Sequence, residues 1–201
     1  MFEEIVSKTI KHEGGYVDHP NDRGGKTKYG ITETVARNYG YEGRMQDLSK
    51  ETAKEIYRQE FWDKVKADEF DEEIAYVLFD TAVNMGTGRA VMLLQETYNR
   101  VTPDNNISVD GIVGPETIGA VNQADREHIL LGYIAGRTQR YFDIVDNNDS
   151  QKVFIRGWLS RMITIVHQIY SHNSKKEVEV GYTIDEVLNA LKEVLEPKLG
   201  G

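Results

Sequence analysis

Apolar residues recur at helical spacing along most of this chain, and this pattern constrains the fold more than any other feature. Apolar side chains that return every three or four positions predict a helix with one buried face. The clearest stripe lies between Phe70 and Gly86, where apolar residues cover more than one face. Similar stripes occupy residues 2–13, 49–62, 89–101, 125–145 and 154–169. The pattern predicts an all-α (mainly helical) fold with a central buried helix over 70–86.

A short stretch near the N-terminus departs from this helical pattern. Between Lys26 and Thr32, the residues Thr27, Tyr29 and Ile31 alternate with other side chains, as in a short hairpin strand. We therefore expect a small β-hairpin directly after the first helix.

Composition and charge narrow the classes of function. The formal net charge of -9 argues against a general nucleic-acid binder and gives no loose attraction to an anionic cell wall. With no cysteine, the chain has neither a disulfide framework nor a thiolate zinc site. No apolar run approaches the length of a membrane span, and the N-terminus lacks the basic head and apolar core of a signal peptide. We expect no nucleic-acid partner and no stable membrane insertion, and any substrate must be held by local contacts.

The one extended polar interruption, residues 102–114, predicts a domain boundary. We expect an N-terminal domain over 1–101 and a helical C-terminal subdomain over 102–174. Residues 175–201 are expected to form a charged linker and an amphipathic helix that starts at a capping box.

The same polar stretch invites comparison with a calcium-binding loop, because Asp104, Asn106 and Asp110 alternate with other residues. Val109 stands where such a loop requires glycine, and Pro115 stands where it requires glutamate. We therefore predict no metal site here.

Glu13 is the strongest candidate for a carboxyl group with a chemical role. It follows Ile5 and Thr9 in steps of four, so it shares the buried face of the first predicted helix. Burial disfavours the charged form of a carboxyl and raises its pKa, which suits a general acid near neutral pH. In the alternative interpretation, this last-turn side chain faces solvent or pairs with a neighbouring lysine or histidine.

A second acidic group is expected from the loop that follows. Asp18 and Asp22 precede Gly24 and Gly25, and a hairpin would fold these carboxylates back toward Glu13. Cleavage of a glycosidic bond uses one carboxylic acid to protonate the leaving oxygen and one carboxylate to steer water or stabilise charge. Turn formation is the alternative role for both aspartates, because Asp stabilises turns beside Gly or Pro.

The region from Glu13 to Thr32 resembles the signature of a known family. Glu13-Gly14-Gly15-Tyr16, His19-Pro20, Asp22, Gly24-Gly25, Thr27 and Tyr29-Gly30-Ile31-Thr32 are similar to the motif of glycoside hydrolase family 108. These are N-acetylmuramidases of phage endolysins and their bacterial relatives, some of them labelled secretion activator proteins. The resemblance implies a lysozyme-like fold with the hairpin beside the active site, and it assigns the role of catalytic acid to Glu13. The spacing is also similar to the Glu, Asp, Thr triad of phage lysozymes, although the Asp-to-Thr step is one residue shorter, which makes Asp22 and Thr27 the further catalytic candidates.

A second resemblance lies in Asp110-Gly111-Ile112-Val113-Gly114-Pro115-Glu116-Thr117. Its structural explanation is an Asp-Gly turn followed by proline at the first turn of a helix that ends near Gln123. The segment is also similar to the DGxxGPxT element of peptidoglycan-binding domains, including the one attached to glycoside hydrolase family 108.

Substrate contacts are expected from Tyr16, Tyr29, Trp62 and Asn84. Aromatic rings can stack on the apolar C–H faces of sugars, but core packing is the alternative for Trp62. Asn84 lies in a helix end similar to the Asn-x-Gly end of lysozyme-like folds, where it can hydrogen-bond a sugar substituent; otherwise it satisfies carbonyls of its own helix. The arginines are expected on a solvated face, or against wall carboxylates: Arg137, Arg140, Arg156 and Arg161.

Together, these features predict a peptidoglycan hydrolase that acts on glycan strands without a metal or organic cofactor. The resemblance supplies the substrate, the β-1,4 bond between N-acetylmuramic acid and N-acetylglucosamine. A monomer made in the cytoplasm and released to the cell wall by a holin-like or other export route is expected. The alternatives are a peptidoglycan-binding protein without catalysis and a secretion-associated interaction protein.

Overall fold

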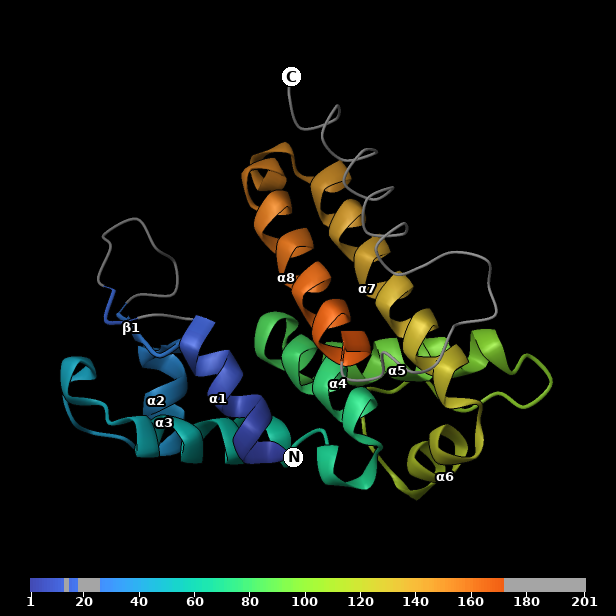
Figure 1. Ribbon diagram of the computed structural model, residues 1–201, viewed down its shortest axis with the longest axis horizontal. Coiled ribbons are helices and arrows are strands. Elements are labelled where there is room, and N and C mark those ends of the chain that lie inside the picture. The colour runs from blue at the N-terminus through green and yellow to red at the C-terminus, as the bar shows by residue number, and fades with distance from the viewer. Residues whose placement is uncertain (13–14, 18–25, 172–201) are drawn as a thin grey trace. The chain divides into compact units, whose positions relative to one another are not determined.

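The computed structural model describes residues 1–12, 15–17 and 26–171, and this part of the chain is mainly helical with one small antiparallel hairpin (Figure 1). The all-α fold and its hairpin are therefore confirmed. The chain divides into two compact units, residues 1–133 and residues 134–201.

The first unit begins with a helix, the hairpin and two short helices. These elements are α1 (Phe2–His12), β1 (Thr27–Lys28), β2 (Ile31–Thr32), α2 (Glu33–Tyr39), the 3-10 turn η1 (Met45–Asp47), α3 (Lys50–Tyr57) and the π-helical turn η2 (Arg58–Trp62). It continues through η3 (Ala67–Glu69), α4 (Glu72–Met85), α5 (Thr87–Val101) and α6 (Pro115–Gln123). The first residues of α7 (Arg126–Asn147) complete this unit.

Hydroxyl side chains cap the starts of the short helices α2 and α3. The Thr32 hydroxyl accepts a hydrogen bond from the Val35 N–H at 3.3 Å and starts α2, which ends at Gly40 with a φ of 97°. The Ser49 hydroxyl accepts from the Thr52 N–H at 3.0 Å and starts α3. The predicted helix over 49–62 is thus present, but its last turn widens to π geometry.

Helix α1 buries the face that its sequence predicts. Ile5, Val6 and Ile10 are at most 5% exposed, and Thr9 is 4% exposed. The Thr9 hydroxyl donates to the Ile5 carbonyl at 3.2 Å, so this polar side chain is satisfied within its own helix.

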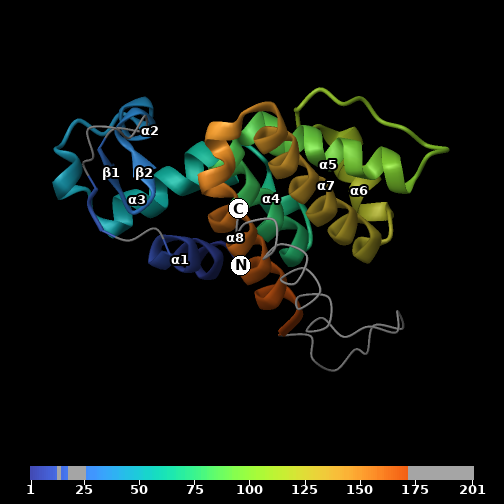
Figure 2. The same ribbon diagram turned by 90° about the horizontal axis from the view of Figure 1, so that it is seen from above.

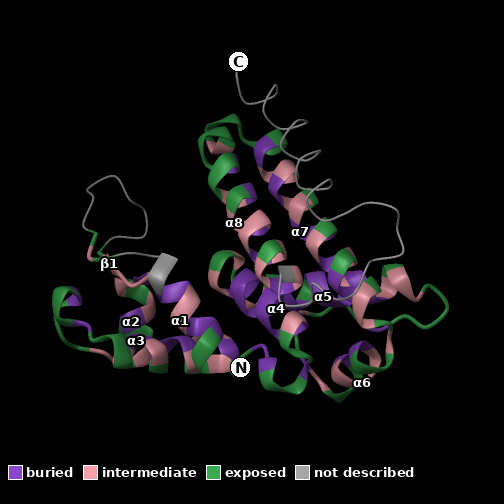
Figure 3. Ribbon diagram, viewed as in Figure 1, coloured by how far each residue is buried: buried purple, intermediate pink, exposed green. Residues whose placement is uncertain are grey.

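Helix α4 is the central helix of the first unit. Every residue from Ile74 to Ala82 is buried, and α4 packs closely along α5 (Figure 3). Gly86 ends α4 with a φ of 89°, a conformation that favours glycine. The apolar stripe over more than one face therefore reflects burial on several sides.

The described part of the second unit is a pair of long helices. It contains most of α7, the 3-10 turn η4 (Asp149–Gln151) and α8 (Lys152–Ser171). The Tyr141 ring of α7 stacks on the Trp158 ring of α8 with centroids 5.1 Å apart, so the two helices pack against each other.

Arg137 of α7 is fully buried, so neither predicted role for this arginine, on a solvated face or against the cell wall, holds. Across the described ranges, no helix combines the length and apolar character needed to cross a membrane.

Candidate active site

Three backbone segments meet at the hairpin that carries Thr27. Thr27 pairs with Thr32 and Lys28 pairs with Ile31, while Thr27 also forms an antiparallel bridge with Val17. The N–H of Val17 and that of Thr27 donate to each other's carbonyls at 2.8 and 2.9 Å. The residues on either side of the acidic loop are therefore held together at its base.

The hairpin turns through Tyr29 and Gly30, both with positive φ, at 54° and 76°. A two-residue turn of this kind matches the right-handed twist of short antiparallel strands, and glycine suits its second position. Tyr29 is thus a turn residue, whereas the alternating pattern assigns it to a strand. Its ring is half-buried and lies 5.2 Å from the Lys28 ammonium.

Two side chains from outside the hairpin hold this turn in place. The Tyr57 hydroxyl of α3 donates to the Tyr29 carbonyl at 2.9 Å, and Tyr57 has no exposed surface. On β1, directly before the turn, the Lys28 ammonium donates to the Gln46 carbonyl at 2.5 Å. The hairpin is therefore fastened to α3 and η1, beside α2 (Figure 2).

The two carboxyl groups predicted to act on the bond lie outside the described residues. Glu13, Asp22 and the alternative Asp18 fall in the undescribed segments 13–14 and 18–25. The described neighbours are Ile5 and Thr9, which precede Glu13 in its helical row and are both buried. The premise that this row faces the core thus holds for its described members.

Of the remaining candidates, Tyr16 and Thr27 lie close to the hairpin base. Tyr16 is half-buried and directly precedes Val17, the residue bridged to Thr27. Thr27 is half-buried on β1. The structure therefore brings Tyr16, Thr27 and Tyr29 into one small β-structured region.

Asn84 lies at the C-terminal end of α4. Its side chain is exposed, and its amide donates to the Asp80 carbonyl at 2.7 Å. The same amide lies 3.4 Å from the Asp80 carboxylate, which is buried. This geometry matches an asparagine that satisfies a carbonyl of its own helix. Contact between Asn84 and a sugar stays a prediction.

Trp62 packs in the core, which corrects its prediction as a substrate contact. The side chain has no exposed surface. Its ring meets Phe2 edge-on at 5.2 Å and Phe79 at 5.4 Å between centroids. A fully enclosed indole offers no face to a sugar ring, so the core interpretation is the one the structure supports.

The DGIVGPET segment is organised around a buried glutamine of α5. The Gln95 amide donates to the Asp110 carboxylate at 2.9 Å and to Thr117 at 3.2 Å. Its carbonyl oxygen accepts from the N–H groups of Asp110 and Gly111 at 3.1 and 2.9 Å. The motif residues therefore hold the loop onto α5.

Hydrogen bonding lowers the pKa of the Asp110 carboxyl below its usual value. The largest cause is the hydrogen bond from Gln95, followed by the one from the Ile112 N–H. This exposed aspartate is thus a charged anchor of the loop. Within the described ranges, no group of three or more His, Asp or Glu side chains is arranged to hold a metal ion.

Two separate family matches meet near the junction of α4 and α5. Residues 6–86 match the family described as Glycosyl hydrolase 108. The chain carries a glycosyl hydrolase 108 domain. It is followed by a Predicted Peptidoglycan domain, matched by residues 89–163. The first match covers the hairpin, and the second covers the Gln95 network; the predicted boundary near residue 102 stays a prediction.

A solved structure supports this assignment over most of the chain. SagA of Brucella abortus has a TM-score of 0.72 and 28% sequence identity to the chain. The similarity covers 85% of this chain and 94% of SagA. The curated proteins contain no match to the sequence.

Sequence reasoning missed three residues that organise the glycosyl hydrolase 108 domain and the domain after it. Tyr57 supports the hairpin, Gln95 holds the DGIVGPET loop, and Asp80 is a buried acid beside Asn84. Asp80 and Gln95 could have been found as polar residues inside apolar helical stripes. Tyr57 has the ordinary pattern of a core aromatic, so its hydroxyl's partner is visible only in three dimensions.

Proposed function

We propose that this protein is an N-acetylmuramidase that cleaves the β-1,4 bond between N-acetylmuramic acid and N-acetylglucosamine. The observation that carries the proposal is the presence of a glycosyl hydrolase 108 domain and a Predicted Peptidoglycan domain in one chain. The glycosyl hydrolase 108 domain indicates cleavage of a glycosidic bond, and the Predicted Peptidoglycan domain indicates peptidoglycan as the polymer. The two domains together support a peptidoglycan hydrolase. Specificity for the bond between N-acetylmuramic acid and N-acetylglucosamine is proposed in addition.

In this mechanism, Glu13 protonates the leaving glycosidic oxygen and Asp22, helped by Thr27, positions a water molecule for attack on the anomeric carbon. The burial of Ile5 and Thr9 supports Glu13, because these two residues belong to the helical row that the sequence predicts to continue to Glu13. Such surroundings raise the pKa of a carboxyl and keep it protonated for proton donation.

Thr27 is supported by the way the hairpin is held. Its backbone pairs with both Val17 and Thr32, and the adjoining turn is fixed by Tyr57. A side chain on such a support keeps its position while the substrate reacts, which is what orientation of a water molecule requires. Tyr16 and Tyr29 flank this position and are the proposed sugar contacts.

We propose the bacterial cell wall as the place of action, reached through a holin-like or other export route.

The test is digestion of purified, insoluble peptidoglycan with identification of the sugar at each new reducing end. Reducing ends on muramic acid support the proposal. Reducing ends on glucosamine would show a different glycosidic bond, and release of peptides without new reducing ends would exclude a glycosidase.

A further inference from the structure

A column of aromatic rings in the second unit runs from the buried interior to solvent. Tyr141 is 2% exposed and stacks on Trp158, with ring planes 20° apart. Trp158 in turn stacks with Phe154, with centroids 6.1 Å apart and planes 24° apart. Phe154 is 52% exposed. The outermost ring of an ordered stack is thus left largely in water.

The buried end of this column is firmly held. The Arg137 Nε donates to the Tyr141 hydroxyl at 2.9 Å, and the guanidinium lies 5.6 Å from the Tyr141 ring. Arg137 is itself fully buried. Since Tyr141 and Arg137 are both enclosed, the buried end of the ring stack is ordered before any ligand arrives, and little conformational entropy is lost there when a ligand binds.

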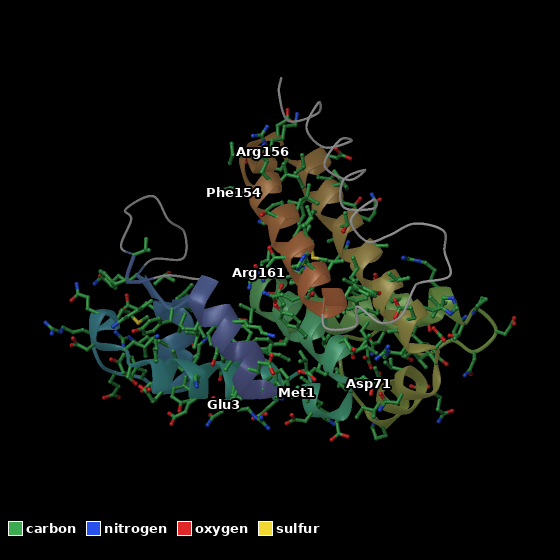
Figure 4. The ribbon with its side chains drawn as sticks, in the orientation of Figure 1. Met1, Glu3, Asp71, Phe154, Arg156 and Arg161 are labelled. Atoms are coloured by element: carbon green, nitrogen blue, oxygen red, sulfur yellow. The ribbon has the colours of Figure 1, made fainter. Side chains whose placement is uncertain are left out.

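The exposed end of the column lies near the N-terminal end of α8. Phe154, Trp158 and Arg161 are spaced by four and three residues, so they share one face of α8. Figure 4 shows Phe154, Arg156 and Arg161 along this helix. From Lys152 to Ser171 there are two arginines and one lysine but no acidic residue, although the whole chain carries a net charge of -9.

We propose that Phe154, stacked on Trp158, forms a platform for a sugar ring of the peptidoglycan glycan strand. An exposed aromatic face suits the apolar C–H face of a sugar. The inference rests on peptidoglycan being the substrate, as proposed above, and the platform lies within the residues matched to the Predicted Peptidoglycan domain.

The test measures co-sedimentation of the full chain with purified, insoluble peptidoglycan. Every variant carries Glu13→Gln, so that the wall is not consumed during the measurement. Phe154→Ala is expected to weaken binding roughly three- to tenfold, the range of one aromatic stacking contact. Phe154→Trp should bind as well as the parent, whereas Phe154→Leu should bind as weakly as the alanine variant.

The matched control is Val153→Ala, because Val153 is 77% exposed on the same helix but takes no part in the ring stack. Its binding should equal that of the parent. Equal binding of Phe154→Ala and the parent would overturn the platform, and so would equal binding of Phe154→Leu and Phe154→Trp, because a ring would then be unnecessary. The midpoint of thermal unfolding checks that each variant is folded.

Failure of the platform is distinguishable from failure of the proposed function. If the chain with intact Glu13 releases new reducing ends while Phe154→Ala binds normally, the platform is wrong and the muramidase stands. If no reducing ends appear but Phe154→Ala weakens binding, the platform stands and the catalytic proposal is wrong.

Discussion

The indole N–H of Trp62 is a polar group inside the hydrophobic core. It is buried and makes no hydrogen bond to any described residue. A buried donor without a partner costs roughly 1–3 kcal/mol, yet the large ring fills space between Phe2 and Phe79. Trp62 is therefore a packing residue with opposing contributions to stability.

We predict that Trp62→Phe lowers the free energy of unfolding by less than about 2 kcal/mol, because loss of packing is partly offset by removal of the unpaired N–H. Binding to insoluble peptidoglycan should be unchanged. Urea unfolding and co-sedimentation measure the two quantities. A variant with intact stability and lost binding would instead return Trp62 to the sugar-binding residues.

A pH effect is predicted at Asp110. Hydrogen bonds, chiefly the one from Gln95, lower the pKa of this carboxyl in the folded chain. A group with a lowered folded pKa stabilises the fold above its unfolded pKa, about 3.9 for aspartate, and this contribution is lost as pH falls through the folded pKa.

We therefore expect Asp110→Asn to be less stable than the parent near pH 7, with a difference that shrinks as the pH falls below about 4. Asparagine keeps the side-chain oxygen, so the comparison isolates the charge. Urea unfolding across this pH range is the measurement, with Asp104→Asn in the same loop as the control. A difference that stays constant with pH would contradict the assignment.

At the scale of elements, the hairpin depends on a residue far from it in the sequence. Tyr29 adopts a positive φ, which is uncommon for a side chain of its size, and its carbonyl accepts from Tyr57 of α3. The surrounding structure thus maintains a backbone conformation that the local sequence does not favour.

Removal of the Tyr57 hydroxyl should loosen this turn. Tyr57→Phe is expected to lower the free energy of unfolding by about 1 kcal/mol and to reduce the rate of reducing-end release, since Thr27 lies in the same hairpin. Tyr39→Phe is the control, because that exposed hydroxyl contacts only Glu55 among the described residues. Full activity in Tyr57→Phe would show that the turn can move without harm to catalysis.

The helices were predictable from sequence because each has its own local signal. Thr32, Ser49 and Asp125 cap the helices that their positions predict, and Pro115 starts α6. The turn at Tyr29 and the Gln95 network were not predictable from sequence, since both depend on hydrogen bonds between residues far apart in the chain. Trp62 was ambiguous for a similar reason, because an aromatic residue at helical spacing suits a core as well as a sugar.

At the scale of the whole molecule, the proposals place catalysis and wall binding on different matched domains. The glycosyl hydrolase 108 domain contains the signature with Glu13, and the Predicted Peptidoglycan domain contains the exposed ring stack of α8. An acidic chain gains little from long-range attraction to an anionic wall. Local contacts on the second domain would then keep the polymer available to the first.

The most direct test of the central claim compares the intact chain with Glu13→Gln for release of new reducing ends from insoluble peptidoglycan. Glutamine keeps the shape of the side chain but cannot donate the proton that the leaving oxygen requires. The account predicts that Glu13→Gln still binds the wall and loses at least about a hundredfold in rate. Equal rates for the two chains would contradict Glu13 as the acid, and binding without any release by the intact chain would contradict catalysis itself.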